Sequence, residues 1–138
     1  MTGLVERLYP LPDYRRTPFT LLRWWESRRL LYNGIVGATG LLTLTGISVI
    51  TALPPFSEPL PLEVAVFGAV IYGIMANFCY SLGWGTELVA RWLWGRDAPD
   101  MGPVLFRQGL IFSVGLTILP LFIAVLAWVA HIVMWIAG

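Results

Sequence analysis

Lysine is absent from this chain, and all nine of its cationic side chains are arginines. The arginines lie before residue 31 or from residue 91 to residue 107, and the hydrophobic stretches between these two zones contain none. Charged residues make up only 12% of the chain, against roughly 25% in a soluble domain. This scarcity excludes an ordinary soluble domain, and a net charge of +1 leaves no excess basic surface for binding nucleic acid.

Cysteine and histidine occur once each, as Cys79 and His131. A single cysteine excludes an internal disulfide, and Cys79 lies within a hydrophobic segment. His131, near the outer end of the last hydrophobic segment, could ligate haem only with a second axial ligand from another chain. A packed or interfacial histidine is the favoured interpretation, and we predict no metal and no cofactor.

No carboxylate lies in the middle of a hydrophobic segment, where a proton pump or an ion-coupled transporter would need one. All acidic residues fall at segment ends or in loops, where we expect water and lipid headgroups to solvate them: Glu6, Asp13, Glu26, Glu58, Glu63, Glu87, Asp97 and Asp100. The chain also shows no nucleophile with a base and no paired carboxylates. We therefore do not expect an enzyme.

Three hydrophobic segments run over about residues 30–53, 62–86 and 104–136. Each reaches the ~20 residues that an α-helix needs to cross the hydrocarbon core of a bilayer. The alternative for the first segment is a secretory signal peptide, but its apolar run exceeds the 7–15 residues of such signals. The sequence therefore predicts an all-α membrane protein, in which residues 1–138 form a single membrane domain with three transmembrane helices.

The connections between the segments indicate the topology. Residues 54–61 form a short proline-rich acidic loop, and Gly95 and Pro103 mark a break before the third segment. We expect the second helix to continue past the membrane through the oppositely charged pair Glu87 and Arg91. Because basic loops stay in the cytoplasm, we predict a cytoplasmic N-terminal arm (residues 1–29) and a non-cytoplasmic C-terminus.

The arm is expected to be partly helical and interfacial. Thr17 and Pro18 are typical of an N-cap followed by the first helical position, so a helix should begin there and lead into the first span. Tryptophans and arginines around residue 25 predict a belt at headgroup level. The expected members of one connected ionic belt are Trp24, Trp25, Glu26, Arg28, Arg29, Glu87, Arg91 and Arg107. The alternative is that each arginine binds lipid phosphate independently.

Small and polar residues recur along the spans and predict the faces on which the helices pack. The predicted packing residues are Gly34, Gly37 and Gly40 on the first helix and Ala69, Gly73, Asn77, Ser81 and Gly85 on the second, with Gly109, Ser113 and Thr117 on the third. Asn77 should lie inside the bundle and bond to a neighbouring helix or a partner chain, because an unpaired amide in hydrocarbon is costly. Pro120 predicts a kink in the third helix, with a static kink favoured over a hinge.

Two stretches carry a resemblance: residues 24–33, WWESRRLLYN, and residues 76–87, ANFCYSLGWGTE. They resemble segments of small uncharacterised bacterial inner-membrane proteins, a group with no known activity. The resemblance covers the first two spans and implies a bacterial inner (cytoplasmic) membrane location.

The function that fits these observations best is a non-catalytic subunit, or an assembly or stabilising factor, of a larger membrane protein complex. Its partners would be membrane lipid and other integral membrane subunits. The alternative is a homo-oligomeric channel or membrane effector, in which a polar helix face would surround a pore. The residues that could form such a face are Thr39, Thr43, Thr45 and Ser48.

Overall fold

The computed structural model describes residues 17–95 and 98–138, and these form three long α-helices. They are α2 (Pro18–Ala52), α3 (Leu62–Trp94) and α4 (Gly102–Ala137). Each is long and apolar enough to cross a membrane, which confirms the predicted all-α fold with three candidate spans. At 33 to 36 residues, each helix is about 50 Å long and therefore exceeds the ~30 Å hydrocarbon core.

The ends of the helices follow local signals in the sequence. Thr17 caps α2, accepting the Thr20 amide on its side-chain oxygen at 3.3 Å, and Pro18 is the first helical residue. The helix then runs without a break into the first hydrophobic segment, as expected. Gly95, with a φ of +59°, ends α3 after the helix has passed through residues 87 and 91. Left-handed backbone of this kind favours glycine, so the end of α3 is set by this residue.

The loop between α2 and α3 is short and held at both sides. The Glu58 amide donates to the Thr51 carbonyl at 3.0 Å, which folds the loop back on the end of α2. Trp128 of α4 donates its indole N–H to the Pro54 carbonyl at 2.9 Å. The loop is therefore held by hydrogen bonds to α2 and α4.

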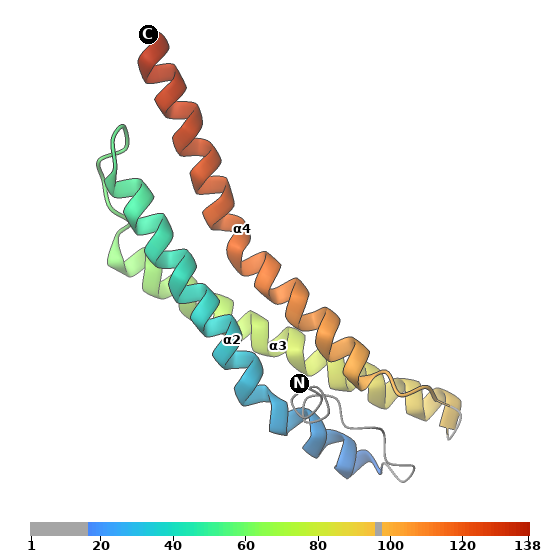
Figure 1. Ribbon diagram of the computed structural model, residues 1–138. Helices are drawn as coiled ribbons and strands as arrows, with labels where there is room; N and C mark the ends of the chain where they lie inside the picture. The colour runs from blue at the N-terminus through green and yellow to red at the C-terminus, as the bar shows by residue number, and fades with distance from the viewer. Residues whose placement is uncertain (1–16, 96–97) are drawn as a thin grey trace, which may run out of the picture.

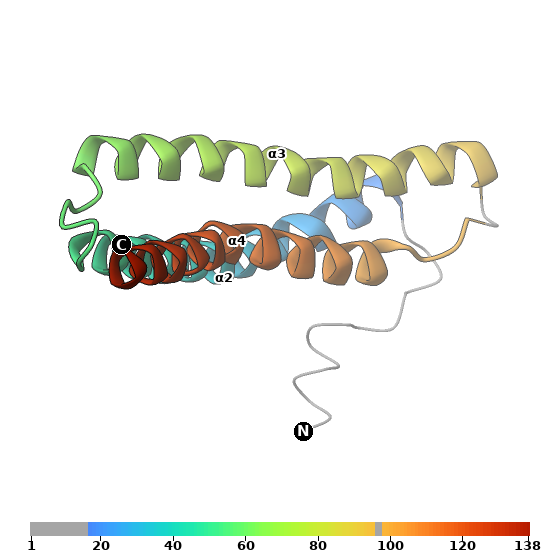
Figure 2. The ribbon, with the colours of Figure 1, turned by 90° about the horizontal axis from the view of Figure 1, so that it is seen from above.

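The three helices form two layers. α2 and α4 run side by side in the same direction and form one layer (Figures 1 and 2). α3, which lies between them in the chain, runs the opposite way and forms the second layer (Figure 2). The contact of α2 with α4 is close, because a Cβ atom at Gly46 would lie 2.7 Å from Leu121. α4 is helical through Pro120, and its axis changes direction near the middle of the helix (Figure 1).

Burial is uneven along the bundle. The buried core lies toward the end that holds the start of α2, the end of α3 and the start of α4, here called the arginine-rich end. Its core residues are Leu21, Trp25, Tyr32, Val36, Ala76, Tyr80 and Phe106. In contrast, residues 62–75 of α3 include no buried residue, and neither does α4 after Thr117. The three helices are thus packed together at one end, whereas toward the other end α2 and α4 stay in contact and the start of α3 is less covered.

Candidate functional site

The arginine-rich end is organised around a buried carboxylate. Glu87 of α3 is only 1% exposed, and its Oε2 accepts the indole N–H of Trp25 from α2 at 2.8 Å. Its Oε1 lies 3.4 Å from Arg91, which in turn contacts Asp100 at 3.1 Å. A buried carboxylate is costly unless it is paired and hydrogen-bonded, and these partners supply both. We call Trp25, Glu87, Arg91 and Asp100 the Glu87 cluster.

The expectation that water and headgroups solvate Glu87 is therefore wrong. The start of α4 covers the carboxylate, because a Cβ atom at Gly102 would lie only 2.7 Å from Glu87 Oε2. A side chain at this point would push the carboxylate away from its hydrogen bond with Trp25. The burial of Glu87 thus depends on a residue that lies in a different helix and gave no signal in the sequence.

Trp25 was expected in a belt of interfacial side chains, but the structure buries its side chain inside the bundle. The indole is 1% exposed and packs on α3, where a Cβ atom at Gly83 would lie 2.9 Å from the ring. Its ring centroid lies 5.4 Å from that of Tyr80 and 6.2 Å from that of Phe106. Trp24 is only half-buried, with the Arg28 guanidinium 4.0 Å above its ring. The two adjacent tryptophans therefore face different surroundings.

The single ionic belt predicted from the sequence is divided in the structure. Among the described residues, one group of ion pairs is the Glu87 cluster, and a second joins Glu26 and Arg29 at 2.9 Å. Arg29 also donates to Ser81 of α3 at 3.1 Å. Arg107 is exposed, and no ion pair to it is found within residues 17–95 and 98–138. The division arises because Glu87 points into the bundle whereas Glu26 lies on its surface.

Three tyrosines link the helices farther along the bundle, and the sequence analysis missed them. The hydroxyl of Tyr32 bonds to Ser113 at 2.8 Å, and that of Tyr72 donates to the Ser113 carbonyl at 3.0 Å. Tyr80 donates to the Trp25 carbonyl. A signal for this pattern was available, because Tyr72, Ala76 and Tyr80 recur every four residues and share one face of α3.

Asn77 forms the hydrogen bond to a neighbouring helix that we expected, but it is less buried in the bundle than predicted. Asn77 and Asn33 of α2 exchange two amide hydrogen bonds, of 3.0 and 3.2 Å. Asn77 also donates to the Gly73 carbonyl at 3.0 Å. However, Asn33 is exposed and Asn77 only half-buried, so the pair lies at the outer edge of the bundle and not inside it. The core position beside it is occupied by Ala76.

The small-residue faces predicted for helix packing are largely uncovered. Ala69 is exposed, and an added Cβ atom would meet no atom within 4 Å at Gly34, Gly37, Gly73 or Gly85. Gly40 approaches α4, with Thr117 3.9 Å from its added Cβ, and Ser81 accepts a hydrogen bond from Arg29 of α2. On α4, Ser113 and Thr117 are buried as predicted. The prediction is therefore wrong for Ala69 and for most of the glycines, and right for the polar residues and Gly40. The reason is that α3 turns its aromatic side chains toward α2 and α4, since these bury more apolar surface.

The polar residues that could have lined a pore do not form one open face. Thr43 is buried, and its hydroxyl has no hydrogen-bond partner within the described part of the chain. Thr39 donates to the Ile35 carbonyl at 2.8 Å, whereas Thr45 is exposed. On α4, His131 is exposed, with its ring centroid 4.7 Å from that of Phe56. Within residues 17–95 and 98–138, no group of three His, Cys, Asp or Glu side chains could hold a metal ion.

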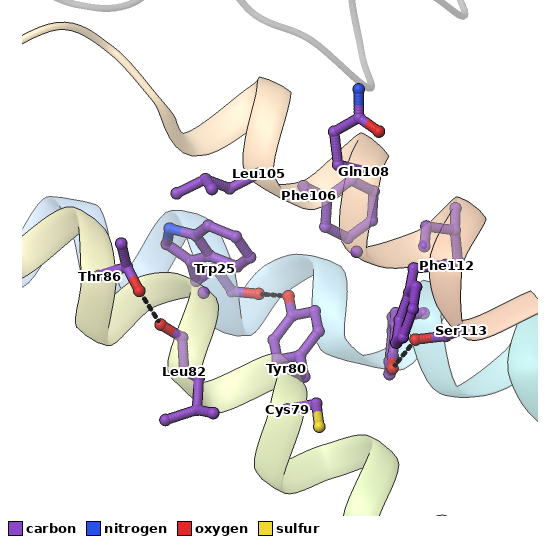
Figure 3. A pocket seen from close by; sticks show the side chains of 14 residues that line it. Trp25, Cys79, Tyr80, Leu82, Thr86, Leu105, Phe106, Gln108, Phe112 and Ser113 are labelled. Carbon is purple, nitrogen blue, oxygen red and sulfur yellow. Dashed lines mark hydrogen bonds between the residues drawn. The ribbon is translucent and has the colours of Figure 1, made fainter. Parts of the chain in front are cut away.

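A cavity of about 360 Å³ opens between α3 and α4, next to the core (Figure 3). Its walls come from residues 79–86 of α3 and residues 105–113 of α4, and Trp25 and Tyr32 of α2 close its base. Aromatic and aliphatic side chains dominate the lining, with a few hydroxyl groups among them.

No protein-family model, no curated protein and no solved structure matches this chain.

Proposed function

We propose that this chain is a non-catalytic integral membrane subunit, or an assembly or stabilising factor, of a larger membrane protein complex. The observation that carries the proposal is the uncovered small-residue surface of α2 and α3. We call this the open face: Gly34 and Gly37 of α2, with Ala69, Gly73 and Gly85 of α3. Asn77 and Ser81 lie beside it and bond to Asn33 and Arg29 of α2. Small residues let helix backbones approach closely in lipid, where little hydrophobic force acts between helices.

The outer half of α3 supports the same proposal. Residues 62–75 include no buried residue, although they form a regular helix. The Glu87 cluster fixes α3 to α2 and α4 at the other end, so the bundle keeps its shape while this half stays uncovered. A partner helix packed against it would bury apolar and glycine surface that the chain itself does not cover.

We also propose that the arginine-rich end faces the cytoplasm of a bacterium. Basic residues next to transmembrane helices are retained on that side of the inner membrane. The described arginines at this end are Arg23, Arg28, Arg29, Arg91 and Arg107.

The proposal is tested by site-specific photocrosslinking in the native membrane. A photoreactive amino acid is placed at Gly73 or Gly37 of the open face and, as a matched control, at Gly115 of α4. All three positions have no atom within 4 Å of an added Cβ, so each should tolerate the larger side chain. We expect one foreign membrane subunit to be crosslinked from positions 37 and 73 and not from position 115.

Two results would contradict the proposal. Crosslinks only between copies of this chain, with a single ring-sized species in mild detergent, would favour the homo-oligomeric channel or effector. Crosslinks to lipid alone from positions 37 and 73 would mean that the open face has no protein partner.

A further inference from the structure

We propose that the cavity between α3 and α4 holds one acyl chain of a membrane phospholipid. Its volume of about 360 Å³ lies within the 300–1,000 Å³ usual for sites that bind small molecules. Its lining includes Phe106, Leu110 and Phe112 of α4 and Tyr80 and Leu82 of α3. The rings of Phe106 and Tyr80 lie next to it (Figure 3). Such a lining favours a hydrocarbon over a polar ligand.

The hydroxyl groups of the cavity wall are already bonded within the protein. Tyr80 donates to the Trp25 carbonyl, and Thr86 donates to the Leu82 carbonyl at 2.8 Å. Ser113 is paired with Tyr32 at 2.8 Å. A quinone carbonyl would need a hydrogen-bond donor, and each of these hydroxyls has already used its single donor within the protein. A hydrocarbon chain needs none.

The remaining polar groups of the lining do not change this argument. The Gln108 amide points away from the aromatic rings (Figure 3). Cys79 contributes a thiol, which is only a weak hydrogen-bond donor. The cavity therefore offers a ligand apolar contacts and no strong hydrogen-bond donor.

The position of the cavity matches the path of a lipid tail. Leu82 and Phe112 line it and are 53% and 67% exposed, so its mouth opens on the surface that faces lipid. Residues 79–86 lie within about 12 Å of the level of Glu87 along α3, at 1.5 Å per residue. A phospholipid whose headgroup lies at the level of Glu87 would direct a chain along this stretch.

The headgroup contributes little to this site. Arg107, the exposed cation closest to the cavity in sequence, is two residues from both Leu105 and Gly109. It therefore lies on the opposite side of α4 from these cavity residues. Binding should depend on the apolar tail, and phosphatidylcholine and phosphatidylglycerol should bind equally well.

The test uses the purified full chain in vesicles that contain phosphatidylcholine with a photoreactive diazirine on one acyl chain. Gly109→Leu fills the cavity, because Gly109 lines it and an added Cβ meets nothing within 4 Å. Gly115→Leu is the matched control, since Gly115 lies on the same helix with the same free space but outside the lining. Gly109→Ala is a milder variant that keeps the test valid if the leucine variant does not fold.

We expect residues 79–86 and 105–113 to be labelled more strongly than residues 62–75, which are at least as exposed to lipid. Gly109→Leu should reduce labelling of the cavity residues to the level of residues 62–75, with a smaller loss in Gly109→Ala. Gly115→Leu should leave it unchanged. Even labelling over all lipid-facing residues, or unchanged labelling in folded Gly109→Leu, would overturn the proposal. A preference for phosphatidylglycerol in competition would overturn the tail-only mode of binding.

Discussion

Glu87→Ala would test how much the buried carboxylate stabilises the bundle. The substitution removes the acceptor of the Trp25 indole N–H, now bonded at 2.8 Å, and leaves that donor buried without a partner. An unsatisfied buried donor costs about 1–3 kcal/mol, and the space left by the side chain adds to this. Arg91 keeps its contact with Asp100 at 3.1 Å, so no cation is left unpaired by the change. We expect a total loss of about 2–4 kcal/mol.

Glu87→Gln separates the hydrogen bond from the charge. The glutamine amide oxygen can still accept the Trp25 N–H, whereas its NH2 group replaces the oxygen that accepts from Arg91 at 3.4 Å. This loss is partly offset because a neutral amide is less costly to bury than a carboxylate, so the net effect should be about 1 kcal/mol or less. Alanine should therefore destabilise the bundle clearly more than glutamine.

The measurement is unfolding by sodium dodecyl sulfate from mild detergent, followed by near-ultraviolet circular dichroism. This signal reports the packing of Trp25, Tyr80 and Phe106, whose ring centroids lie 5.4 to 6.3 Å apart. Glu26→Ala is the control, because its ion pair with Arg29 at 2.9 Å lies on the surface with Glu26 45% exposed. Such pairs contribute less than about 1 kcal/mol. Equal losses in Glu87→Ala and Glu26→Ala would refute the role assigned to the buried carboxylate.

Three further predictions follow from the same contacts. Asn77→Leu and Asn33→Leu should each lower the free energy of unfolding by about 0.5–2 kcal/mol. Because the two amides bond to each other, the double variant should lose no more than either single variant, and additive losses in the detergent unfolding assay would contradict this. Gly102→Ala should cost about 1–3 kcal/mol by crowding the Glu87 carboxylate, whereas Gly109→Ala should be nearly neutral; equal thermal stabilities would contradict it. In a Cys79→Ser background, a cysteine placed at position 58 should react with an impermeant maleimide from outside the cell, whereas one placed at position 97 should not. The reverse pattern would invert the proposed topology.

The helices themselves could be predicted from local signals. The lengths of the hydrophobic segments predicted three spans, and Thr17, Pro18 and Gly95 marked where two of the helices begin and end. These signals work because caps and helix-ending residues act on their own few neighbours. They carry no information on how each helix is rotated about its axis.

The rotation of α3 could not be predicted for that reason. Both Gly73–Asn77–Ser81 and Tyr72–Ala76–Tyr80 recur every four residues, so the spacing alone supports two different packing faces. The structure turns the tyrosine face inward, where the Tyr32 and Tyr80 rings lie 4.7 Å apart. The burial of Glu87 was missed because it depends on Trp25 and Gly102, which belong to other helices.

The long-range character of the Glu87 cluster bears on how the chain is made. The bond between Trp25 and Glu87 joins residues 62 positions apart, and the cover at Gly102 arrives still later in synthesis. Until α4 has entered the membrane, the Glu87 carboxylate lacks that cover and stays open to water, headgroups or other proteins. A ribosome stalled before residue 102 would therefore present an exposed acidic group at the membrane surface. Docking of the start of α4 buries this group, so a chain that includes α4 differs from one that ends before residue 102 in a feature that a protease or an insertase can distinguish.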